Sequence, residues 1–91
     1  MNLQDALFNW LQIKLVTEAR PDDGAAVETL TFFEEILRVD HGLEQFEIAE
    51  MDTTMVHVRY TLEGNKKRQM FGREIAYKLL NDIESVPKIE N

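Results

Sequence analysis

The side chains in this 91-residue sequence that could do chemistry are two histidines and a large set of carboxylates. His41 and His57 do not form a paired metal-ligand motif such as H-E-x-x-H, and the one serine, Ser85, has no neighbouring base. The four glycines are isolated from one another, so there is no glycine-rich phosphate loop. These patterns predict no catalytic, metal or cofactor site, and we expect a protein that is not an enzyme.

A second chemically interesting group is a cluster of basic residues, because six bases face only two acids between residues 59 and 78. This local excess could bind phosphate or nucleic acid. The candidate anion patch consists of Arg59, Lys66, Lys67, Arg68 and Arg73. Basic residues also keep a hairpin tip solvated and protect a strand edge from pairing with other chains. The sequence favours the solvated tip and leaves anion or nucleic-acid binding through the 59–73 hairpin as the alternative.

The net charge of −7 is unevenly distributed along the chain. Residues 1–55 contain twelve acids and three bases, whereas residues 56–91 contain seven bases and five acids. An acidic protein is repelled by polyanions, so nucleic acid is not the leading expectation for a partner.

Two further features concern the compartment in which the protein works. The chain has no cysteine, which excludes disulfides and thiolate chemistry. It has neither a basic N-terminal leader pattern nor an apolar run of the ~18 residues that a membrane span needs. We therefore expect a cytoplasmic protein that does not enter a membrane.

Helical spacing predicts two helices in the first half, over residues 3–19 and 23–40. The first has apolar residues over an arc wide enough to require contact on two sides. Pro21 ends it, and an aspartate of the following Asp22-Asp23 pair is placed to cap the second helix. Gly42 suits the end of that second helix, where a left-handed residue is favoured.

Alternation of apolar and polar residues predicts three strands, over residues 45–51, 55–62 and 66–71. A three-residue loop between the first two strands makes Ile48 face Val58 and Phe46 face Tyr60. A tight turn centred on Gly64-Asn65 would pair Val58 with Phe71. A third helix is expected over residues 73–84, and residues 86–91 form a polar tail. The fold class is a single α+β domain over residues 1–85, in the order αα-βββ-α.

The same alternation divides the strand residues between two faces of the sheet. Apolar Val56, Val58 and Tyr60 belong to the face that the helices cover, while the methionines fall on the opposite face. Methionine fills gaps in protein cores and also serves at adaptable interfaces, and the sequence leaves both readings open. The candidate partner face consists of Met51, Met55, His57, Arg59, Arg68 and Met70 on the sheet, with Trp10 of the first helix as a second candidate. A lone tryptophan is more often a core residue, but it can also anchor an interface.

These observations favour a small acidic cytoplasmic protein that works by contact with another protein, or with itself as a homodimer. The contact surface is either the open sheet face or the first helix. The sequence does not specify which sheet face the first helix covers.

Overall fold

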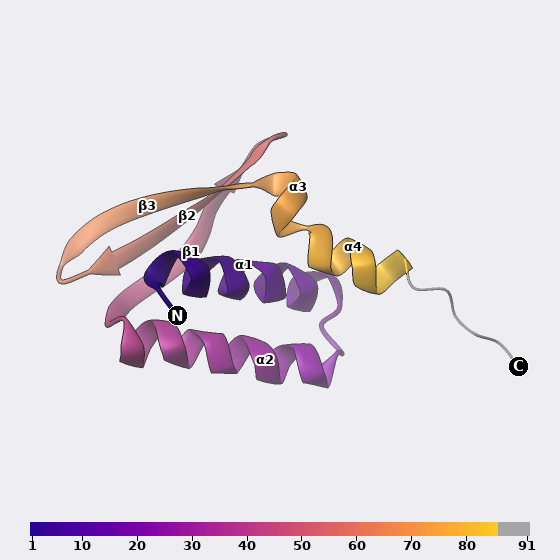
Figure 1. Ribbon diagram of the computed structural model, residues 1–91, viewed down its shortest axis with the longest axis horizontal. Helices are drawn as coiled ribbons and strands as arrows, with labels where there is room; N and C mark the ends of the chain where they lie inside the picture. Colours follow the sequence, from indigo (N-terminus) through magenta and orange to yellow (C-terminus); the bar gives the residue numbers. More distant parts are fainter. Residues whose placement is uncertain (86–91) are drawn as a thin grey trace, which may run out of the picture.

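The computed structural model describes residues 1–85 of the chain, and the tail predicted over 86–91 lies outside the described residues. Its helices and strands follow the predicted order αα-βββ-α in one small domain (Figure 1). The elements are α1 (Leu3–Ala19), α2 (Gly24–Glu35), the π-helical turn η1 (Ile36–Asp40), β1 (Leu43–Met51), β2 (Met55–Leu62), β3 (Asn65–Gly72), α3 (Arg73–Ala76) and α4 (Lys78–Ser85).

The helical hairpin begins and ends with the local signals that its sequence carries. The Asn2 side chain accepts a hydrogen bond from the backbone of Asp5 at 2.8 Å, which caps α1. The Asp23 side chain caps α2 in the same way by accepting from the backbone of Ala26 at 3.1 Å. After η1 the chain reverses at Gly42, whose φ of +69° is unfavourable for residues with a side chain.

Helix α1 lies at the centre of the molecule, between the sheet and α2 (Figure 1). Its side chains contact both neighbours: the Phe8 ring lies 5.5 Å from the ring of Phe71 in β3, while α1 also packs along α2. Near its C-terminal end, Ile13 and Val16 pack with Ala26 of α2 and Leu80 of α4. The wide apolar arc of α1 is therefore buried on several sides, as its composition predicted.

The sheet is antiparallel with the order β1-β2-β3, and the helices cover one of its faces. Phe46 pairs with Tyr60 and Ile48 with Val58, which confirms the predicted register of the first hairpin. The core side of the sheet is formed by Val56, Val58, Tyr60 and Phe71, all buried.

The second hairpin turns one position earlier than predicted, so its predicted register is wrong by two residues. Val56, not Val58, pairs with Phe71, and Leu62 pairs with Asn65 across a turn made of Glu63 and Gly64. Both turn residues have positive φ, 53° and 78°, as a twisted two-residue hairpin turn requires. A shift of two residues preserves the alternation, so the side chains of β3 stay on their predicted faces.

The helix predicted over residues 73–84 is interrupted at Tyr77, which separates α3 from α4. Ala76 of α3 is buried in the larger core cluster, whereas Leu80 of α4 is buried in the smaller one with Val16 of α1. Leu80 is buried, but Ile75 is exposed.

The Glu63 backbone provides a test of the second turn. A side chain at positive φ costs about 1 kcal/mol, and asparagine tolerates this conformation best among residues with a side chain. We expect Glu63→Asn to raise the free energy of unfolding by ~0.5 to 1 kcal/mol in urea denaturation. Glu63→Ala, which keeps the strain, is the control, and equal stabilisation by both variants would contradict the assigned turn.

Candidate partner-binding face

The face of the sheet turned away from the helices is called here the open face. No described helix covers it (Figure 1). The strand register gives it polar, charged and methionine side chains. Cross-strand pairing places three residues in each of two neighbouring rows: Glu50, His57 and Met70 in one, and Glu47, Arg59 and Arg68 in the other. The open face consists of Glu47, Glu50, Met55, His57, Arg59, Thr61, Lys66, Arg68 and Met70.

One end of the open face is shaped by the β1–β2 turn, which Asp52 holds together. Its Oδ1 accepts hydrogen bonds from the backbone N–H groups of Thr54 at 2.8 Å and Met55 at 2.7 Å. These two bonds, together with the one to His57, lower the pKa of the Asp52 carboxyl from its ordinary 3.8 to about 2. The carboxylate therefore stays ionised throughout the neutral range and fixes the turn.

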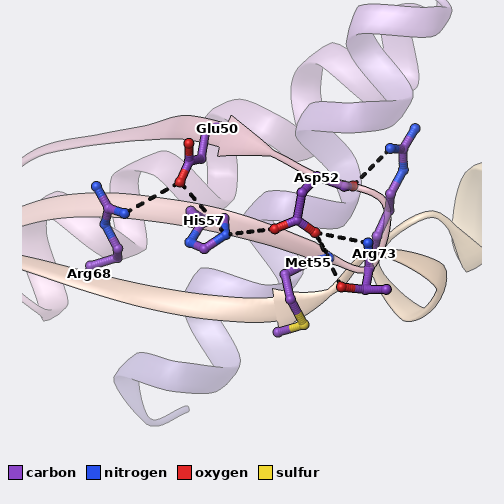
Figure 2. Close-up of polar contacts among 7 residues, drawn as sticks. Glu50, Asp52, Met55, His57, Arg68 and Arg73 are labelled. Carbon is purple, nitrogen blue, oxygen red and sulfur yellow. Dashed lines mark hydrogen bonds and ion pairs between the residues drawn. The ribbon is translucent and has the colours of Figure 1, made fainter.

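A chain of polar contacts runs from this turn across the strands (Figure 2). His57 Nε2 lies 3.3 Å from Asp52 Oδ2 and 3.9 Å from Glu50 Oε1. The same Glu50 oxygen lies 3.6 Å from Arg68 Nη1. The His57 side chain is only 12% exposed although it belongs to the open face, so its neighbours cover most of the ring. Its Nδ1 is shielded from solvent and has no hydrogen-bond partner among the described residues.

The second row of the open face carries a better-aligned ion pair. Arg59 donates from Nε and Nη2 to the same carboxylate oxygen of Glu47, at 3.2 and 3.0 Å. Both side chains are solvent-exposed, so the pair contributes little to stability, on the order of 0 to 1 kcal/mol. The effect of the pair is on charge: Glu47 neutralises Arg59, one of the arginines on this face.

Arg73 joins the β1–β2 turn to the helical end of the molecule. Its backbone N–H donates to the Thr54 carbonyl at 2.9 Å, and its Nη1 donates to the Asp52 carbonyl at 2.9 Å (Figure 2). The guanidinium carbon also lies 5.5 Å from the centre of the Tyr77 ring. Arg73 therefore has a structural role in positioning the turn.

Five of the seven residues predicted for a partner face lie together on the open face: Met55, His57, Arg59, Arg68 and Met70. Met70 is the most accessible apolar residue among them, 52% exposed. Met55 is half-buried beside the β1–β2 turn.

The face predicted for Met51 is wrong, because a β-bulge interrupts the alternation of β1 between Ile48 and Glu50. The extra residue turns Glu50 to the open face and Met51 to the covered one. Met51 there packs against the core, and its sulfur accepts a hydrogen bond from Tyr77 Oη at 3.4 Å.

Trp10 also lies away from any surface for a partner, because its side chain is only 1% exposed. Its ring meets Phe46 edge-on at 5.3 Å, and its Nε1 donates to Glu34 Oε2 at 3.3 Å. Trp10 is thus a core residue that ties α1 to both β1 and α2. The first helix, the second surface that the sequence suggested, has most of its apolar side chains buried.

The five residues of the predicted anion patch are divided by the fold. Arg59 and Arg68 are paired with carboxylates, and Arg73 is bonded to a backbone carbonyl. Lys66 and Lys67 lie near the tip of the β2–β3 hairpin on opposite faces of β3, since they pair with Thr61 and Tyr60. The geometry therefore does not gather the five charges into one site.

Sequence reasoning did not assign Glu50 and Asp52 to the face, although both are central to its charge network. Asp52 carried a usable signal, since an aspartate two residues before a threonine in a loop is typical of an Asx-turn. Glu50 carried none, because its orientation depends on the bulge at Ala49.

Comparisons with protein-family models, with curated proteins and with solved structures found no match to this chain. Within residues 1–85 no three histidines, aspartates or glutamates come together in a way that could hold a metal ion. No helix in this described range has the length and apolar composition needed to cross a membrane.

The lowered pKa of Asp52 predicts a specific acid dependence of stability. A carboxyl with a depressed pKa stabilises the fold above its unfolded value of 3.8, and this contribution is lost as the pH falls towards about 2. We expect the free energy of unfolding to fall more steeply between about pH 4 and about pH 2 in the unmodified chain than in Asp52→Asn.

The asparagine variant is a matched comparison, because its amide oxygen can still accept the two backbone hydrogen bonds but cannot titrate. All other carboxyls are common to both chains. Urea denaturation at a series of pH values measures the free energy of unfolding of both chains. If it fell equally with pH in the two chains, the assigned role of Asp52 would be contradicted.

Proposed function

We propose that this chain is a small cytoplasmic protein-interaction module that binds a partner protein through the open face of its sheet. The observation that carries the proposal is an uncovered sheet face on which Met70 is half exposed beside a neutralised network of acids and bases. Methionine is a common residue at adaptable binding surfaces, so an exposed methionine within an uncovered sheet fits a contact role.

The chemistry of the face suits another protein surface. Arg59 and Arg68 are each paired with a glutamate, so the face offers both donors and acceptors without a large excess of either charge. Protein interfaces combine apolar contacts with arginine and ordered polar groups in this manner. Met55 and Met70 would supply the adaptable apolar part, and the charged pairs would set orientation.

Nucleic-acid binding, the alternative, has less support. Sheets that bind single strands stack bases on aromatic side chains, whereas the strand aromatics Phe46, Tyr60 and Phe71 belong to the covered face. Among the described basic residues of the predicted patch, only the two lysines near the hairpin tip have neither an ion-pair partner nor a side-chain hydrogen bond.

Site-specific photocrosslinking in the cells that produce the protein tests the proposal. A photoreactive amino acid at position 70 is compared with one at position 27, where Val27 is similarly exposed but lies on α2. We expect a discrete crosslinked product from position 70 and none from position 27. A product with the mass of two chains would identify a homodimer, and any other discrete mass would identify a different protein.

A second variant tests the charged part of the face. Arg59→Glu, introduced together with the photoreactive residue at position 70, places two acids opposite each other and should reduce the product at least about five-fold. Circular dichroism confirms that the variant folds. No product from position 70, or equal products from positions 70 and 27, would contradict the proposed function.

A further inference from the structure

Helix α2 lies on the opposite side of α1 from the sheet (Figure 1). Together with η1 it carries a second exposed apolar feature. Phe32 is 59% exposed and Val39 is 71% exposed, and the half-buried Ile36 lies between them. Their spacing of four and three residues places all three on one side of the helix. These three residues are called here the apolar stripe.

The surface along the apolar stripe is concave. A hollow of about 250 Å³ lies along it, lined by its three residues and by Glu35 and Asp40. The Phe32 ring packs edge-on against Phe33 at 5.4 Å, which holds one end of the hollow in place. At the other end the π-helical turn η1 carries Val39, and such turns often occur at functional sites.

The rim of the stripe is acidic. Glu28, Glu35 and Asp40 are exposed, and none of them forms an ion pair with a basic residue in the range 1–85. The only base on this helical segment, Arg38, is directed to the sheet, where its guanidinium lies 5.2 Å from the centre of the Phe46 ring. The stripe is therefore apolar along its centre and negatively charged at its margin.

We infer that the apolar stripe docks a basic amphipathic helix of a partner protein. Anchors at positions i, i+4 and i+7 are the pattern by which one helix packs along another. The unpaired carboxylates select lysine and arginine at the flanks of that helix. Two copies of this chain packed through the stripe would bring acidic rims together, so charge disfavours a second copy as the occupant.

This surface is separate from the open face, since α1 lies between them. Together the two surfaces would allow the chain to hold two proteins at once. The inference does not depend on the proposed function, and either surface can fail without the other.

Fluorescence anisotropy with a designed peptide tests the inference. The probe is a helix-stabilised peptide with leucines at positions i, i+4 and i+7 and lysines on the flanks. Two controls accompany it: a scrambled peptide of the same composition, and a version with glutamate in place of each lysine. We expect the basic amphipathic peptide to bind at least about ten-fold more tightly than either control.

Two matched variants locate the binding. Val39→Lys places a positive charge beside the hollow and should weaken the peptide at least about ten-fold, whereas Met70→Lys on the open face should leave binding unchanged. Amide chemical shift changes should cluster within residues 28–40. Three results would overturn the inference. The scrambled peptide could bind as tightly as the basic amphipathic peptide, no peptide could bind, or Val39→Lys and Met70→Lys could affect binding equally.

Discussion

The burial of α1 on several sides is the constraint on which the rest of the structure depends. Residues such as Trp10, Leu15 and Val16 point in different directions around this helix, and each is almost fully buried. One sheet and one helix are needed to cover two sides of α1, and α4 closes its C-terminal end. A chain of this length has no further element among its described residues to cover the outer surfaces. The open face and the apolar stripe therefore both remain exposed.

The features that the sequence predicted well are those set by local periodicity and capping. The alternation of Val56, Val58 and Tyr60 assigned the covered face correctly, and the width of the apolar arc predicted contact of α1 on two sides. Met51 was misplaced because a bulge adds one residue without any mark in the hydrophobic pattern. The second turn was misplaced because Glu63, a residue rarely found at positive φ, occupies its first position.

The candidate site was predictable only in part, because its chemistry depends on contacts between separate strands. The methionine and arginine positions followed from alternation, but the pairing of Glu50 with Arg68 requires the bulge and the register together. The apolar stripe was hidden for a different reason. Phe32 and Val39 lie in a helical segment that also carries buried apolar residues, such as Ala26 and Leu37, and composition alone does not separate the two sides.

The most direct test of the account is an NMR measurement on the ε-methyl groups of the four methionines, which sample different environments in one chain. A soluble paramagnetic agent should broaden the signal of exposed Met70 more strongly than the signal of partly buried Met51. Addition of native cell extract should then shift or attenuate the Met70 signal, with Met1 as the exposed control. If Met51 were broadened as strongly as Met70, the bulge and the assignment of the two faces would be wrong. If extract affected Met70 no more than Met1, the open face would not be a binding surface.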